Sequence, residues 1–358
     1  MKMERIKKRL PLIIAAALLV VSALCVLGYR STSRMLLSQQ AAERWRGDNE
    51  TAFAQLSCFM PNGGGVSEEE IYNFRSAMLT KLSEASFEVS ADTTLIHDAW
   101  CGFDKANIAS GQRKGEVSVT AVGGYFFDFH PIKLVSGNYL RPDDLMEDRV
   151  LLDRECAWLL FGSDDVAGMS FEINGQPFYV AGVIEREGDR FSRLAYTDGL
   201  GIYMSWEGWK KLSETAKISC YELVMAEPVK GFVYRAAQEK FPIGTGEMLD
   251  NSYRFEWECI IKMLRDSPTR FMHLGNASYP YWENAARAAE NSCLVWLLAA
   301  VITALLPAVL LLVFTIKALA YGKGRLEQDY ITEAREKISE AWRVRVRQRW
   351  EKKNPNKK

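Results

Sequence analysis

The residues best suited to chemistry are four carboxylates that follow Pro142, namely Asp143, Asp144, Glu147 and Asp148. Clustered carboxylates can bind calcium, but a calcium loop places its oxygen ligands at fixed positions around an invariant glycine. The spacing of these four residues does not match that pattern. We therefore interpret them as a solvated acidic turn.

Metal and thiol chemistry also has little support from residue spacing. The three histidines, His97, His130 and His273, do not pair with another ligand at a zinc-like spacing, so we predict no metal site. The seven cysteines are spread singly and form no CxxC motif. A Cys58–Cys101 disulfide is one alternative, and singly buried thiols are the favoured one. Spacing leaves the oxidation state open for Cys58, Cys101, Cys156, Cys220 and Cys259.

Catalytic and nucleotide-binding motifs are absent from the sequence. It contains no GxSxG, HExxH, SxxK, GxxxxGK or GxGxxG segment. We therefore predict no catalytic residue, no cofactor and no ATP site, and rank a membrane-anchored enzyme lowest among the functions considered. The formal net charge is zero, with 45 basic and 45 acidic residues, which argues against a nucleic-acid-binding protein.

Two long apolar stretches determine where the rest of the chain lies relative to a membrane. Residues 10–29 carry no charge, and residues 293–320 begin with an equally apolar run. Each is long enough to cross a hydrocarbon core of about 30 Å. Basic residues precede the first stretch and follow the second, so the positive-inside rule places residues 1–9 and 321–358 in the cytoplasm. Residues 30–292 then lie outside, in a two-pass protein of the plasma (inner) membrane. We favour an uncleaved anchor over a signal peptide, because the apolar run continues past the weak cleavage site at Val21–Ala23.

The basic tail alternates charged and apolar residues near its end. Polybasic segments beside a membrane are attracted to anionic lipid by about 1 kcal/mol per basic residue. We slightly favour lipid contact over a solvated tail whose charge only enforces topology. The candidate lipid-contact residues are Trp342, Arg343, Arg345, Arg347, Arg349 and Trp350.

The outer region shows clear local signals for both helices and strands. Asn174-Gly175, between two alternating apolar runs, predicts a tight hairpin turn. Residues 149–153 read as a buried strand, and Asp153 can cap a helix that Gly162 ends. Ser67 and Glu70 form a capping box before another helix. Strands over 117–122, 201–204 and 220–226 alternate with helices over 206–214 and 229–241, which predicts an α+β domain with a mixed sheet. Residues 31–57 read as an outward continuation of the first membrane helix, and 185–199 as a mobile connection.

The order of these elements resembles the MacB-like periplasmic core domain of MacB-like and FtsX-like ABC transporter permeases. The matching pieces are Gly124-Tyr125-Phe126 as an approach strand, Ser136–Asp144, Val150–Gly162 ending in LFG, and Gly168–Ile184 with its Asn-Gly turn. The signature spans residues 67–242.

The resemblance implies a non-catalytic extracytoplasmic domain, between two transmembrane helices, that transmits motion or binds partners in export or cell-envelope handling. A separate ABC ATPase, a full permease subunit and a homo- or hetero-oligomer are the implied partners. Family permeases carry four membrane helices, two of them after the span that follows the domain, so we expect a truncated membrane part and an accessory or partial permease subunit. The alternative is a membrane-anchored sensor or scaffold that binds a peptide or envelope component and has no link to transport.

Overall fold

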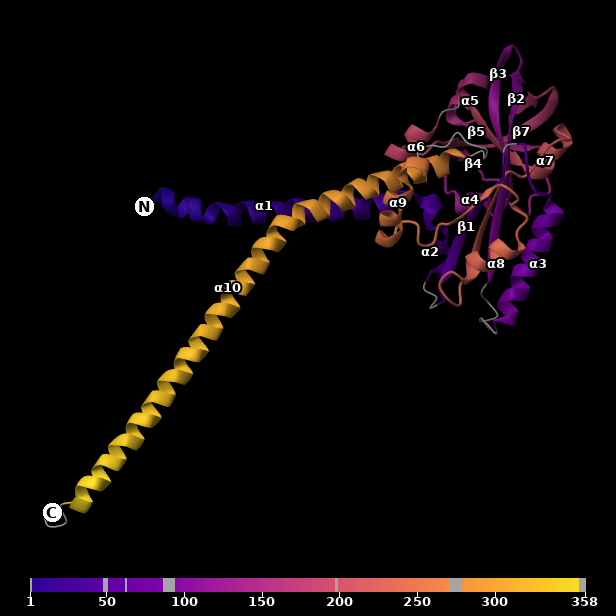
Figure 1. Cartoon of the computed structure of the whole chain (residues 1–358). Helices are drawn as coiled ribbons and strands as arrows, with labels where there is room; N and C mark the ends of the chain where they lie inside the picture. Colours follow the sequence, from indigo (N-terminus) through magenta and orange to yellow (C-terminus); the bar gives the residue numbers. More distant parts are fainter. Residues whose placement is uncertain are drawn as a thin grey trace. The chain divides into compact units, whose positions relative to one another are not determined.

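The computed structural model describes residues 2–47, 51–61, 63–85, 94–196, 199–270 and 279–353 (Figure 1). The chain divides into two compact units. One comprises Gly28–Trp296, and the other combines Met1–Leu27 with Leu297–Lys358. Each unit is described separately below.

The Gly28–Trp296 unit is built on a ten-stranded sheet in the order β10-β1-β9-β2-β3-β8-β5-β7-β4, with β6 pairing with both β2 and β7. The pairs β3–β8 and β5–β7 are parallel and the others are antiparallel, so the sheet is mixed, as predicted. The strands are β1 (Phe53–Phe59), β2 (Ile96–Ser110), β3 (Arg113–Gly124), β4 (Lys133–Gly137), β5 (Arg149–Asp153), β6 (Ser170–Ile173), β7 (Gln176–Glu185), β8 (Gly201–Ser205), β9 (Cys220–Ala226) and β10 (Glu247–Asp250).

Helices cover this sheet and connect its strands, which confirms the α+β class. The helices of the unit include α3, whose buried face is formed by Ile71, Phe74, Met78 and Leu82. The helical elements within the unit are η1 (Leu37–Gln40), α2 (Ala41–Arg46), α3 (Glu68–Glu84), α4 (Phe126–Phe129), α5 (Arg154–Leu160), α6 (Arg190–Ala195), α7 (Trp206–Leu212), α8 (Phe232–Lys240) and α9 (Trp257–Arg270). The long helices α1 (Lys2–Ser33) and α10 (Tyr281–Lys353) each belong partly to both units.

Local sequence signals are confirmed at three places. The Ser67–Glu70 capping box is present at the start of α3. Asp153 caps α5 by accepting a hydrogen bond from the backbone N–H of Cys156. Asn174 and Gly175 have φ values of 50° and 81°, the left-handed pair that a tight hairpin between β6 and β7 requires.

Three expectations about the elements are wrong. Residues 53–59 form β1, not a continuation of the membrane helix, and all seven residues are buried. A strand buried on both faces lacks the alternation that identifies strands in a sequence. The segment 185–199, predicted from the sequence to be only a connection, contains the helix α6. The side chain of Asp189 caps the start of this helix. The approach strand ends at Gly124, and α4 starts at Phe126.

The other unit contains α1 as far as Leu27 and the part of α10 from Leu297 onward, with the charged segments at both chain ends. Two helical stretches, Leu10–Ser33 and Tyr281–Ala320, are long and apolar enough to cross a membrane by length and composition. Their side chains are largely exposed, as shown by Leu12 at 68% and Phe314 at 73%. The Ser22 hydroxyl donates to the Ala300 carbonyl at 3.0 Å, so the two helices touch within this unit.

Candidate functional site

A buried cluster of charges joins the sheet to the first turns of α10. Arg254, which follows β10, donates through Nη1 and Nη2 to the two carboxylate oxygens of Glu283 at 2.6 and 2.8 Å. Its Nε donates to Glu290 at 2.6 Å. Glu283 and Glu290 are seven residues apart, so they lie on one face of α10. All three side chains are at most 4% exposed, which fixes the domain-side end of α10 against the sheet.

Arg287 extends this cluster to the edge of the sheet. It donates through Nε to Glu283 at 2.7 Å and through Nη2 to Glu247 of β10 at 2.8 Å. Its guanidinium also lies 4.1 Å from the ring centre of Tyr279. Burial alone would lower the pKa of Arg254, but the carboxylates of Glu283 and Glu290 outweigh burial and hold that pKa above its usual value. The arginine therefore stays charged.

The segment that follows α1 is fixed to the same side of the sheet. Arg254 Nη1 also donates to Oε1 of Gln39 in η1 at 3.2 Å. Gln55 of β1 donates to the Ser38 carbonyl at 2.7 Å and accepts from the Ala41 N–H at 2.9 Å. The segment after α1 is thus bound to β1, and the start of α10 is bound to the neighbouring strand β10.

A small apolar cluster completes the junction. It contains Leu36 after α1, Phe191 of α6, and Ala285, Ala286 and Ala289 of α10. Small side chains allow close packing of α10 on its neighbours, so the contact leaves little free space.

Buried polar groups lead from the charge cluster into the sheet. Asn251 donates to the Ser57 hydroxyl at 2.7 Å, and Ser57 donates to Glu222 of β9 at 2.9 Å. The other oxygen of Glu222 contacts His130. The His130 ring lies 4.3 Å from the ring of Trp282 in α10, so this chain of contacts, which begins at Asn251 after β10, ends on α10.

This arrangement is suited to transmitting displacement. Separating a buried, fully hydrogen-bonded ion pair is strongly unfavourable because each charge would be left in a poorly polarisable interior. A shift of α10 must therefore move β10, β1 and η1 with it, or break the cluster. The named residues of the cluster are Arg254, Glu283, Arg287 and Glu290, and we call them the junction cluster.

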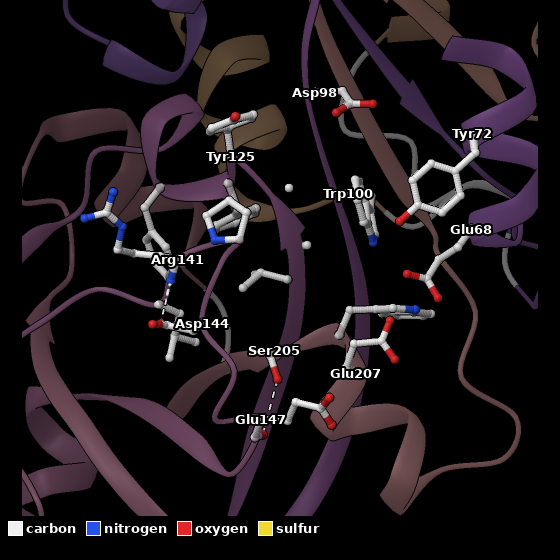
Figure 2. Close-up of a pocket in the computed structure, with 18 of the residues that line it drawn as sticks. Glu68, Tyr72, Asp98, Trp100, Tyr125, Arg141, Asp144, Glu147, Ser205 and Glu207 are labelled. Carbon is white, nitrogen blue, oxygen red and sulfur yellow. Dashed lines mark hydrogen bonds between the residues drawn. The ribbon is translucent and has the colours of Figure 1, made fainter. Parts of the chain in front are cut away.

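A separate pocket lies on another part of the domain (Figure 2). Its volume is about 470 Å³. Figure 2 shows Arg141 and Asp144 on one side of it and Tyr72 with Glu68 on the other. Trp100 forms part of its wall, and Gly123 gives the indole room, because a Cβ there would lie 2.3 Å from the ring.

The pocket contains hydrogen-bonding groups without partners. The Nε1 atoms of Trp100 and Trp206 are buried and have no hydrogen-bond partner within the described part of the chain. Deeper in the wall, Arg75 binds Asp98 through two hydrogen bonds of 3.0 and 2.7 Å. Burial raises the pKa of Asp98 despite this pairing. Both tryptophans line the pocket, so a ligand acceptor atom that reached either indole N–H would satisfy a buried donor.

The structure agrees in part with the interpretation of the four carboxylates after Pro142 as a solvated acidic turn. Asp143, Asp144 and Asp148 are exposed, as a solvated turn should be. Asp144 and Glu147 also line the pocket, which the interpretation did not foresee. Among the described residues, no group of three or more histidine, cysteine, aspartate or glutamate side chains is arranged to hold a metal.

The cysteines are all free thiols, and six of the seven are buried. Cys101 lies opposite Cys220 in the β2–β9 pair, whereas Cys58 lies opposite Tyr221. The neighbour of Cys101 in the sheet is therefore Cys220 and not Cys58. Burial raises the pKa of Cys58, Cys101 and Cys220 alike, which keeps these thiols protonated and unreactive.

The tail residues belong to the last part of α10. Trp342 is 68% exposed, and Arg343, Arg345, Arg347 and Arg349 are exposed as well, while the side chain of Trp350 lies outside the described residues. At 100° per residue, Arg343 and Arg347 fall on one side of the helix and Arg345 and Arg349 on the opposite side. The alternation seen in the sequence is thus carried by a helix without a single basic face, and lipid contact stays a prediction.

The junction cluster was missed by sequence reasoning. Its one local signal is the spacing of Glu283, Arg287 and Glu290 at i, i+4 and i+7 immediately before an apolar span. Arg254, which these residues surround, lies 29 positions before Glu283 along the chain. No local pattern connects it to them.

Comparison with known proteins identifies one matching family. The family model of the MacB-like periplasmic core domain matches residues 12–239. No curated protein matches the chain.

Solved structures similar to the chain come from transporter proteins. The extracellular domain of the noncanonic ABC-type transporter YknZ from Gram-positive bacteria aligns at 15% identity and a TM-score of 0.38, covering 52% of this chain and 92% of that one. The periplasmic region of MacB from Actinobacillus actinomycetemcomitans aligns at 15% identity and a TM-score of 0.39, covering 63% and 98%. A domain of a putative permease protein from Porphyromonas gingivalis aligns at 13% identity and a TM-score of 0.32, covering 60% and 95%.

Proposed function

The chain belongs to the MacB-like periplasmic core domain family, and from this premise we propose that its domain transmits movement between its two membrane helices and partners outside the membrane. The protein is a permease-like membrane protein of the inner membrane with an extracytoplasmic domain. The proposed role is mechanical and non-catalytic, in export or cell-envelope handling.

The junction cluster is the observation that supports this role. Arg254 contacts Gln39 after α1 and both Glu283 and Glu290 of α10. A change in the relative position of the two helices would therefore act on one buried side chain. Rigid interfaces of this kind convert small helix shifts into domain movement, because packed cores have discrete arrangements instead of deforming smoothly.

The energy for such movement must come from outside these residues. The sequence contains no GxxxxGK phosphate-binding loop. We propose that an ABC ATPase supplies it, together with a full permease subunit in a hetero-oligomer. Both termini lie in the cytoplasm in this proposal, which agrees with the basic residues that flank the two apolar stretches.

Purification of the tagged full chain from native membranes in a mild detergent tests this role. We expect an ABC ATPase and a permease to co-purify and to be identified by mass spectrometry. In the purified complex, nucleotide trapping with ATP and vanadate should change hydrogen exchange in residues 251–254 and 283–290.

Two variants make that test specific. Arg254→Met should retain the ATPase but lose the nucleotide-dependent exchange change in the domain, whereas Lys133→Met, in an exposed ion pair, should retain both. Isolation of the chain without any ATPase or permease would remove the main support for the proposal.

The pocket supports a second candidate function, a sensor or scaffold that binds a peptide or envelope component. The indole N–H groups of Trp100 and Trp206 require acceptors such as peptide carbonyls. Glu68 and Glu207, now paired with Lys210 at 2.6 and 3.0 Å, could instead accept from a ligand ammonium group.

A blocked tripeptide with a central lysine is a suitable probe for this candidate. Calorimetry on the full chain should detect binding, and Trp206→Phe should weaken it several-fold by removing one N–H donor. Trp158→Phe, on the exposed face of α5, is the matched control and should bind normally. If the probe does not bind, or if both variants bind equally well, the pocket is not a peptide site.

A further inference from the structure

Helix α9 exposes a row of large apolar side chains. Trp257, Ile261 and Leu264 are 59%, 43% and 47% exposed. They are spaced at i, i+4 and i+7 and so share one face of the helix. Ile260 and Met263, at 0% and 4% exposure, form a different face that packs on the domain. The exposed row is therefore not the side that attaches α9 to the protein.

The polar residues of α9 occupy a third face. At 100° per residue, Glu258 and Lys262 lie about 100° and 140° from Trp257 on one side, and the buried Ile260 and Met263 lie on the other. The exposed apolar row separates the two. This order of buried, apolar and polar faces is the one expected of a helix lying at the boundary between a protein, a membrane and water.

Helix α9 begins close to the residues at which the apolar stretch of α1 ends. The hydroxyl of Tyr29 donates to the carbonyl of Phe255, two residues before α9 begins. Tyr29 lies in the candidate span Leu10–Ser33. The exposed row therefore begins two residues after a backbone carbonyl that is hydrogen-bonded to α1.

We propose that α9 lies in the outer lipid–water interface, with Trp257, Ile261 and Leu264 inserted at the boundary between headgroups and acyl chains. A lipid surface is the occupant that this position selects, because α9 begins two residues after Phe255, whose carbonyl accepts from Tyr29 of the candidate membrane span. Tryptophan at the headgroup level is favoured, since its ring is apolar and its N–H can reach water. The domain then has a third membrane contact besides α1 and α10, whether or not it serves in transport.

A depth measurement on the full chain tests this placement. The chain, in a Cys259→Ser background, is reconstituted in phosphatidylcholine–phosphatidylglycerol vesicles with a nitrobenzoxadiazole fluorophore on Ile261→Cys. A nitroxide on the lipid acyl chain near the headgroup serves as quencher. We expect a blue-shifted emission and a loss of about half of its intensity, as insertion at the acyl boundary implies.

Two control positions carry the same fluorophore. Lys262→Cys lies on the polar face of α9, and Gln112→Cys lies at the exposed turn between β2 and β3. Both should emit as in water and be quenched little. Equal quenching at all three positions would overturn the proposal. A blue shift at 261 without quenching would also overturn it, because the row would then be covered by protein.

Discussion

Arg254 is the residue on which contact between the domain and α10 depends. It has two carboxylate partners on α10 and one amide partner in η1. Buried ion pairs contribute little net stability compared with well-packed apolar residues, but they strongly favour one arrangement of their neighbours. Arg254 therefore contributes mainly by fixing the positions of α10 and η1 relative to each other.

Arg254→Met should lower the free energy of unfolding by about 3–5 kcal/mol, because it removes the buried cation to which both Glu283 and Glu290 are bound. Denaturant unfolding of the full chain in detergent, followed by tryptophan fluorescence, measures this loss. Lys133→Met removes an exposed pair with Glu185 and should change the free energy of unfolding very little, because solvent screens exposed ion pairs. Equal losses in the two variants would show that the junction cluster is not a special contact.

His97 provides a pH-dependent test of the packing after α1. Its ring lies 4.1 Å from Trp45 of α2, and burial lowers the pKa of His97 to about 4. In the unfolded chain, the pKa of this histidine is near its usual value of about 6.5. Between these values the unfolded state binds more protons, so stability should fall as pH drops from about 6.5 to about 4.

The His97→Gln variant cannot take up that proton. Unfolding midpoints measured at a pH just above 7 and again near 5 should therefore differ less in the variant than in the unchanged chain. The same pH dependence in both proteins would mean that His97 is not the titrating group.

At the scale of elements, the β6–β7 hairpin shows how a short signal determines structure. Asn174 and Gly175 both have positive φ, and a Cβ at Gly175 would meet no atom within 4 Å. Gly175→Ala should therefore cost about 1–2 kcal/mol through backbone strain alone. Gly188→Ala is the matched control, because that site is equally open and lacks a positive φ. Thermal unfolding of both variants measures the difference, and no difference would contradict this account of the turn.

Elements with local signals could be predicted from the sequence, and those defined by distant contacts could not. The caps at Ser67 and Asp153 and the Asn174-Gly175 turn depend on residues within a few positions of one another. Strand β1 has no such signal, because all seven of its residues are buried and its two faces therefore do not alternate in polarity. The junction cluster was equally hidden, since Arg254 meets Gln39 across 215 positions.

For the whole molecule, the orientation in the membrane is the property most open to test. In a Cys259→Ser background, a membrane-impermeant maleimide should label Leu145→Cys in intact cells, since Leu145 is 97% exposed on the domain. Lys353→Cys should react only after permeabilisation, because the basic flanks favour cytoplasmic termini. Labelling of Lys353→Cys from outside would reverse the proposed topology.

The close approach of α1 and α10 at the base of the domain has a consequence for how such proteins arise. A Cβ at Gly28 would lie 2.9 Å from the ring of Trp296, so the first and last residues of the domain unit are neighbours. A unit whose ends meet can be inserted into a hairpin of two helices without separating them. The domain can thus be exchanged between helix pairs as a cassette during evolution. An engineer could likewise graft it onto an antiparallel coiled coil.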